Sequence, residues 1–251
     1  MVVVVAQQKG GVGKTTTAAN VGVLLARRKG RVLLVDCDPQ SALTRQLGLD
    51  VCPDRLSLVD VLAGRAVASD AIVGDVHGVD VIPGARELAG IEMSLVGELG
   101  RELFLRDALD QVLGGYEHVV IDTPPNLGLL TINALACSEH VIAPVSAEDE
   151  ASIHGVIELR QTTARLAKRL GAVTPSLSVL LTRWQGHRVS SRRTEEVLIA
   201  EHVAPVGRIP SRSALVARAA TCRIPLAIKE PDSSPALAYV RLTELLLGAT
   251  A

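Results

Sequence analysis

Apolar residues gather in short blocks along the chain, and longer stretches with helical spacing separate these blocks. The opening run VVVVA at 2–6 is typical, with consecutive aliphatic residues and no polar alternation. Continuous apolar runs of this length predict strands that are buried on both faces. We therefore expect strands at 2–6, 31–36, 79–83, 118–122, 140–145 and 177–182.

The stretches between the blocks predict helices, because their apolar residues recur three and four positions apart. Helical spacing at 88–113 is interrupted at Gly97 and Gly100, whereas 41–80 shows only short helical patterns and turns. Regular alternation of strands and helices predicts a doubly wound, mostly parallel sheet with helices on both faces, in the α/β class. We expect the clearest helices at 17–28, 151–170 and 235–247.

Length and composition fit a single domain that spans residues 1–251. A chain of 251 residues can bury a two-sided sheet, and no low-complexity linker or internal repeat divides it. The apolar share is 48%, but the aromatic residues are only one Phe, one Trp and two Tyr, so aliphatic side chains must form the core. Such a core suits a parallel sheet that helices cover on both faces.

Cysteine usage and the apolar profile limit the possible function classes. The cysteines are widely spaced and form no C-x-x-C pair, which argues against a disulfide framework or a zinc site and favours a reducing, cytosolic compartment. The apolar start is short and lacks a preceding basic region, so we expect no signal peptide, and no apolar run approaches the ~20 residues of a membrane span. The cysteines are Cys37, Cys52, Cys137 and Cys222.

Charge is distributed unevenly, although the net charge is only −1. The segment 160–229 holds 13 Lys and Arg against 3 Asp and Glu, whereas the rest of the chain holds 13 basic and 24 acidic residues. Such asymmetry indicates a surface for a polyanion in the C-terminal third. Solvated helix faces are the alternative explanation for a charge run.

The segment KGGVGKTT at 9–16 lies between the first predicted strand and the first predicted helix. Glycine-rich turns at this place present backbone N–H groups to a phosphate, and the helix N-terminus adds partial positive charge. Lys14 can neutralise the β- and γ-phosphates, and the hydroxyl of Thr15 is placed for Mg²⁺. A tight turn without a ligand is the alternative, but a lysine and two threonines at these offsets favour phosphate. The strict G-x-x-x-x-G-K-[ST] pattern is broken at Gln8, and Lys9 begins the loop instead.

Acidic residues end two of the predicted strands at the same edge of the sheet as this loop. Asp36 and Asp38 follow the second strand, and Asp122 ends the strand at 118–122. Ligands gather at the carboxyl ends of parallel strands, so these carboxylates should meet the loop. Asp122 has the position of the second nucleotide motif of P-loop proteins, where an aspartate holds Mg²⁺ through water. The following Pro124-Pro125 forms a stiff turn that either senses the γ-phosphate or simply ends the strand.

Together these motifs resemble one family. KGGVGKTT, VLLVDCDPQ and VVIDTPPNLGLLTINAL, with the closing PDSSPALAY, are similar to the ParA (Soj) family of partition ATPases, which have a deviant Walker A loop. The resemblance covers nearly the whole chain and implies a P-loop ATPase that uses ATP and Mg²⁺ and forms a homodimer when ATP is bound. Since the chain opens directly on its first strand, it is similar to the short members that lack an N-terminal helix-turn-helix domain.

The resemblance also assigns roles to individual residues. It implies that Lys9 crosses into the partner subunit's site and neutralises charge on the transferring phosphoryl group, as an arginine finger does. It implies that Asp38 positions or activates the attacking water, and that Asp36 and Asp122 support Mg²⁺ and the loop. The residues implied around ATP are Lys9, Gly10, Gly11, Val12, Gly13, Lys14, Thr15 and Thr16, with Thr182 and Pro210 at the adenine.

In this family the ATP-bound dimer binds double-stranded DNA without sequence preference, and a ParB-type partner stimulates hydrolysis and releases it. The basic C-terminal third agrees with that role, and the scarcity of aromatic residues favours duplex DNA over single strands. The resemblance therefore implies a cytoplasmic, nucleoid-associated ATPase for chromosome or plasmid partition. Candidate DNA contacts are Arg188, Arg192, Arg193, Arg212 and Arg218.

The chain departs from the family pattern in three places. It has DPQSA where members commonly have DPQGN, EDEA at 148–151 where they often have EYYA, and IPSRSALVAR at 209–218 where they have IPRNVRLSEA. These changes leave the nucleotide motifs intact. They affect the register of the DNA-binding arginines and the identity of the activating partner.

Other functions make different demands on the sequence. A MinD-like division-site ATPase needs a basic amphipathic C-terminal helix, and the tail at 242–251 has no basic residue. Iron–sulfur relatives need cysteine ligands at a dimer axis, which scattered single cysteines do not provide. A P-loop kinase or ligase needs an acceptor-substrate site, for which we find no residue pattern. A positioning ATPase for a protein cargo fits the sequence as well as one for DNA.

Overall fold

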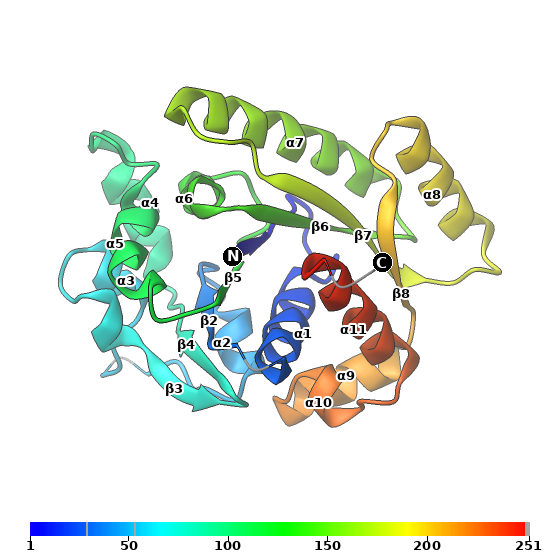
Figure 1. Ribbon diagram of the computed structural model, residues 1–251, viewed down its shortest axis with the longest axis horizontal. Coiled ribbons are helices and arrows are strands. Elements are labelled where there is room, and N and C mark those ends of the chain that lie inside the picture. The colour runs from blue at the N-terminus through cyan, green and yellow to red at the C-terminus, as the bar shows by residue number, and fades with distance from the viewer. Residues whose placement is uncertain (29, 53, 249–251) are drawn as a thin grey trace.

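An eight-stranded sheet with helices on both faces forms the molecule, which a computed structural model describes for residues 1–28, 30–52 and 54–248 (Figure 1). The strand order is β3-β4-β2-β5-β1-β6-β7-β8, and every pairing is parallel except that of β3 with β4. The predicted fold class is therefore confirmed. The strands are β1 Val2–Val5, β2 Val32–Asp36, β3 Val73–Val76, β4 Val79–Ile82, β5 His118–Asp122, β6 His140–Ser146, β7 Ser176–Trp184 and β8 Pro205–Pro210.

Two helical layers cover the sheet. Helices α1, α2, α10 and α11 pack on one face, and α3, α5, α6 and α7 pack on the other (Figure 1). The helices are α1 Lys14–Arg27, α2 Ala42–Gln46, α3 Leu58–Leu62, α4 Leu88–Ser94, α5 Phe104–Leu113, α6 Leu129–Cys137, α7 Ala151–Leu170, α8 Val189–Ala200, α9 Ser213–Cys222, α10 Leu226–Lys229 and α11 Ser234–Leu246, with 3₁₀ turns η1 Ala68–Ala71 and η2 Leu95–Gly97.

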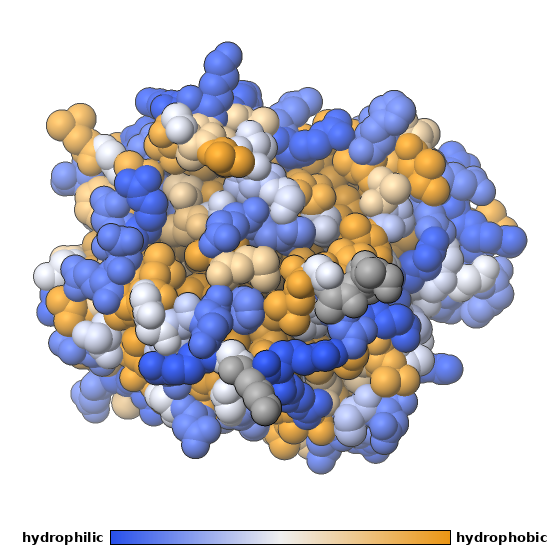
Figure 2. All heavy atoms as spheres, viewed as in Figure 1, coloured by the Kyte–Doolittle hydropathy of each residue, from blue (hydrophilic) through white to orange (hydrophobic). Residues whose placement is uncertain are grey.

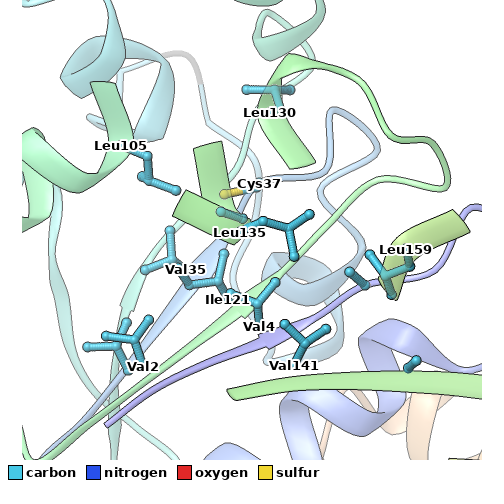
Figure 3. Close-up of a cluster of buried hydrophobic side chains, with 14 of the residues drawn as sticks. Val2, Val4, Val35, Cys37, Leu105, Ile121, Leu130, Leu135, Val141 and Leu159 are labelled. Atoms are coloured by element: carbon cyan, nitrogen blue, oxygen red, sulfur yellow. The ribbon is translucent and has the colours of Figure 1, made fainter. Parts of the chain in front are cut away.

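Each buried strand supplies side chains to two separate apolar cores, because successive side chains point to opposite faces. In β1, Val2 and Val4 belong to the core under α5, α6 and α7, while Val3 and Val5 belong to the core under α1 and α11. Figure 3 shows the first core, where Val4 lies near Ile121 and Val141 of the neighbouring strands. This two-sided burial explains why the central strands are continuous apolar runs.

The predicted elements agree with the structure except near their ends and at the sheet edges. Helix α1 begins at Lys14, three residues before the predicted start, so the helix takes up the end of the glycine-rich loop. The break expected within 88–113 is present, since η2 ends at Gly97 and α5 begins at Phe104. The edge strands β3 and β8 and helices α6, α8, α9 and α10 were not predicted.

The edge strands differ from the interior strands in composition. Strand β3 has only mixed burial and pairs with β4 through an irregular antiparallel register, with Asp75 and His77 in the left-handed region. Strand β8 begins at Pro205 and ends at Pro210, and its partner is β7.

In the described ranges, no helix is both long enough and apolar enough to cross a membrane. Hydrophilic and hydrophobic residues are interspersed over the face seen in Figure 2. The last three residues of the tail at 242–251 lie outside the described residues.

Candidate nucleotide site

The carboxyl ends of three central strands bring the predicted site together. Val5 of β1 and Asp36 of β2 are both in register with Asp122 of β5. The loop at 9–16 leaves β1 at this edge and enters α1 at Lys14. The predicted carboxylates and the glycine-rich loop therefore share one edge of the sheet.

The loop has the backbone conformation that its glycines predict. Gly11 and Gly13 have φ values of 73° and 94°, in the left-handed region where a side chain would be strained. Gly13 is also the N-cap of α1, so the free N–H groups of the first helical turn are directed toward the loop. This arrangement can hold a phosphate group without any side chain.

A cavity of about 790 Å³ opens above the loop, large enough for a nucleotide. The predicted adenine contacts Thr182 and Pro210 line it together with Asp38 and Pro125. Thr182 also supports the loop, because its hydroxyl donates to the carbonyl of Val12 at 2.8 Å. The other residues that line the cavity include Gly10, Gly11, Val12, Gly13, Lys14, Thr15, Thr16, Glu148, Arg183, Arg188 and Arg212.

Lys14 lies buried at the centre of the site. Its Nζ donates to the carbonyl of Lys9 at 3.2 Å, which folds the side chain over the loop. Burial lowers the pKa of Lys14, and the carboxylates of Asp122 and Asp38 act in the opposite direction. A bound phosphate would supply the negative charge that this buried ammonium lacks.

Asp122 has the electrostatic character of a metal or water ligand. Its two carboxylate oxygens are buried, and no hydrogen bond that meets the usual distance limit reaches them within the described residues. Burial raises the pKa of Asp122 well above its ordinary value, and Asp36 adds to this, while Thr15 and Lys14 oppose it. Unsatisfied oxygens of this kind are unusual in a protein interior, and carboxylate and hydroxyl oxygens are the donors that Mg²⁺ prefers. The residues present therefore fit Mg²⁺.

Both carboxylate oxygens of Asp36 accept hydrogen bonds from neighbouring protein groups. Its Oδ2 accepts from the backbone N–H and the hydroxyl of Thr44, at 2.8 and 2.7 Å, and its Oδ1 accepts from the N–H of Asp38 at 3.2 Å. The hydroxyl of Thr44 also accepts from the N–H of Gly84 at 2.9 Å. Burial raises the pKa of Asp36 to about 6 despite these bonds. Asp36 thus fixes the turn that carries Asp38, which is buried and faces the cavity.

Two supporting residues were missed by sequence reasoning. Gln7 is buried just before the loop, and its Nε2 donates to the carbonyl of Ser152 at 3.1 Å and of Pro144 at 3.4 Å. Its Oε1 accepts from the N–H of Gln8 at 2.9 Å. A buried glutamine directly after a strand was the available signal, because such a side chain needs partners.

Arg183 is the second such residue. It follows Thr182 near the end of β7 with φ 53°, an uncommon conformation outside glycine, and its Nη2 donates to the carbonyl of Gly11 at 3.0 Å. Nothing in the sequence pattern distinguishes Arg183 from the other arginines of this region.

The candidate DNA-binding arginines are all exposed, and they lie on different elements. Arg188 and Arg212 line the nucleotide cavity, whereas Arg192 and Arg193 lie on α8 and Arg218 lies on α9. Arg188, Arg193 and Arg218 form ion pairs with Glu148, Glu150 and Glu230.

Lys9 does not point to its own cavity. Its Nζ forms an ion pair with Asp149, in the turn before α7, and both side chains are partly exposed. The ammonium is therefore held within its own chain in this structure.

Comparison with known proteins places the chain among ATPases. The family model described as an AAA domain matches residues 1–179. The sporulation initiation inhibitor protein Soj of Bacillus subtilis is 36% identical over 250 residues, which cover 97% of this chain and 96% of Soj. The chromosome partitioning protein ParA of Caulobacter vibrioides is 41% identical over 181 residues, covering 71% of this chain and 66% of ParA.

Among solved structures, cobyrinic acid a,c-diamide synthase from Mycobacterium smegmatis with bound ADP and magnesium is similar, with a TM-score of 0.83 and 35% sequence identity. The match covers 98% of this chain and 93% of that chain.

Proposed function

Because the chain belongs to the ParA/Soj family of P-loop ATPases, we propose that it is a nucleotide switch that positions DNA cargo, as in chromosome or plasmid partition. In this proposal an ATP-bound homodimer binds double-stranded DNA without sequence preference, and a ParB-type partner stimulates hydrolysis and releases it. The observation that carries the proposal is the glycine cradle with buried Lys14 in the cavity. Beside Lys14 lies the buried carboxylate of Asp122, to which no hydrogen bond is found within the described residues.

The site residues have separate tasks in this proposal. Backbone N–H groups of the loop and the ammonium of Lys14 bind the phosphates, and Thr15 and Asp122 hold Mg²⁺, which would balance the phosphate charge. Asp38 accepts a proton or a hydrogen bond from the attacking water, because it faces the cavity. The N–H of Gln40 donates to Oδ1 of Asp38 at 2.8 Å and so keeps this carboxylate in position. Asp36 keeps that turn in place through Thr44.

Lys9 and the exposed arginines act outside their own nucleotide site. Lys9 reaches the phosphates held by a second copy, so each site is complete only in the dimer. Arg188, Arg192, Arg193, Arg212 and Arg218 contact DNA phosphates, and we expect DNA affinity to fall steeply as salt concentration rises. Nucleoid association follows from that affinity.

Three measurements on the purified protein test the proposal: ATP hydrolysis, ATP-dependent dimerisation and binding to duplex DNA of random sequence. We expect slow hydrolysis, and DNA binding only when ATP or a non-hydrolysable analogue is present. Lys14→Ala should lose nucleotide binding, whereas Lys9→Ala should still bind nucleotide but lose hydrolysis. DNA binding that ignores nucleotide, or full activity of the Lys14 variant, would refute the proposal.

Further measurements separate the alternatives. A positioning ATPase for a protein cargo would show the same DNA and ATP behaviour. It would be identified by the protein assembly to which it binds. A diamide synthase, the activity named for the solved relative from Mycobacterium smegmatis, would hydrolyse ATP only when an acceptor substrate is supplied. A membrane-targeted ATPase would float with anionic liposomes when ATP is bound.

A further inference from the structure

The turn between β6 and α7 has three consecutive acidic residues, Glu148, Asp149 and Glu150, which we call the acidic turn. Asp149 forms an ion pair with Lys9 of the same chain. The hydrogen bond from Lys9 lowers the pKa of Asp149 from its ordinary value, so this carboxylate is charged near neutral pH. The lysine that should act on a second copy is thus bound within its own chain.

The other two acids of the turn bind arginines that are candidates for DNA contact. Oε1 of Glu150 lies 2.9 Å from Nε of Arg193. Oε1 of Glu148 lies 3.5 Å from Nη1 of Arg188. The acidic turn therefore neutralises cations that belong to two functions, nucleotide hydrolysis and DNA binding.

Hydrogen bonds also connect the start of α7, directly after the acidic turn, with the glycine-rich loop. Gln7 donates to the carbonyl of Ser152, in the first turn of α7, and accepts from the N–H of Gln8. Lys14 donates to the carbonyl of Lys9. A phosphate that draws Lys14 away from this carbonyl removes one of the contacts that keep Lys9 beside Asp149.

We propose that the acidic turn is an autoinhibitory clasp, which holds Lys9 away from a second copy and competes with DNA for the charges of Arg188 and Arg193 in the free subunit. This inference rests on the proposed function, since Lys9 must leave Asp149 to reach a partner's nucleotide.

Competition makes the clasp reversible. A nucleoside triphosphate carries several negative charges and DNA presents a row of them, so each attracts these cations more strongly than one exposed carboxylate does. Because exposed ion pairs contribute little, we expect each pair to shift an equilibrium by about 1.5- to 5-fold. The clasp therefore raises the protein concentration needed for dimerisation and the DNA concentration needed for binding, but it prevents neither step.

Two variants test the two arms of the clasp. Asp149→Asn removes the charge but keeps an oxygen that can accept from the N–H of Ala151, now 3.1 Å from Oδ1 of Asp149. With a non-hydrolysable ATP analogue, the midpoint protein concentration for dimerisation in analytical ultracentrifugation should fall about 2- to 5-fold below that of the wild type. Glu150→Gln should tighten ATP-dependent binding to a random-sequence duplex by a similar factor.

Glu196→Gln is the matched control, because Glu196 is exposed on α8 and forms no ion pair in the described ranges. It removes the same charge from the neighbouring surface. If Glu196→Gln tightened DNA binding as much as Glu150→Gln, or if Asp149→Asn dimerised like the wild type, the clasp would be overturned. A wild-type protein that neither dimerised nor bound DNA with ATP would instead overturn the proposed function.

Discussion

Gly155 on α7 is a position where one added methyl group would disturb the phosphate loop. A Cβ built there would lie 2.1 Å from Oε1 of Gln7 and 3.1 Å from its Cδ. Gln7 is buried and held by three hydrogen bonds, so its amide has no free space to move into. Gly155→Ala should therefore displace Gln7 and release the start of the loop from α7.

The expected cost follows from the bonds that Gln7 makes. Each intramolecular hydrogen bond contributes about 1 kcal/mol to stability, and buried groups left without partners cost more. Replacing glycine by alanine inside a helix returns about 1 kcal/mol. With three bonds at risk, we expect a net loss of about 2 kcal/mol in the free energy of unfolding, and ATP affinity should fall because the loop is less well held.

Urea unfolding followed by circular dichroism, with nucleotide binding measured in parallel, would test this expectation. Gly90→Ala is the matched control, since Gly90 lies in α4 and a Cβ there would meet, among the described residues, no heavy atom within 4 Å apart from its chain neighbours and the backbone of its own helix. This control should be neutral or stabilise the protein by up to about 1 kcal/mol.

A double-mutant cycle decides whether Gln7 transmits the effect. In a Gln7→Ala background the clash is absent, so Gly155→Ala should stabilise the protein, by up to about 1 kcal/mol. An equal loss from Gly155→Ala in both backgrounds, or a gain in the wild-type background, would refute the proposed contact between α7 and the loop.

Three further substitutions have defined outcomes. Thr182→Val keeps the side-chain shape but leaves the carbonyl of Val12 without its hydroxyl donor, so we expect a loss of about 1–3 kcal/mol in urea unfolding together with weaker nucleotide binding. Gly84→Ala would place a Cβ 2.8 Å from the carbonyl oxygen of Asp36, so overpacking should cost about 1–3 kcal/mol in urea unfolding and should slow ATP hydrolysis. An unchanged hydrolysis rate would contradict the role given to the turn that carries Asp38. Burial lowers the pKa of His140 from 6.5, so the unfolded chain binds the proton first and stability is lost as the pH falls below about 6.5. His140→Gln should reduce the drop in melting temperature between about pH 7.5 and about pH 5.5, and an undiminished drop would exclude His140 as its source.

The sheet interior could be predicted from the sequence because its physical cause is local. Strands such as β5 are buried on both faces, and a run of apolar residues records that burial without reference to any other part of the chain. The placement of Asp122 beside the loop followed as well, since the carboxyl ends of parallel strands lie at one edge.

What the sequence could not supply are contacts between distant segments. The pairing of Gln7 with the first turn of α7 joins residues 145 positions apart, and the bond from Gly84 to Thr44 spans 40 positions. The edge strand β8 was missed because its residues are partly exposed and prolines begin and end it, so no buried apolar run marks it. The pair of Lys9 with Asp149 likewise depends on geometry that no local pattern encodes.

The two edges of the sheet limit how copies of this chain can associate. At one edge Pro205 and Pro210 lack the N–H groups that an added strand would use. At the other edge the left-handed Asp75 lies within β3, and the left-handed His77 directly follows it. Strand-to-strand growth is the irreversible route by which sheet proteins aggregate. With both edges protected, copies of this chain can be present at high local concentration without growing into fibres through the edges of their sheets.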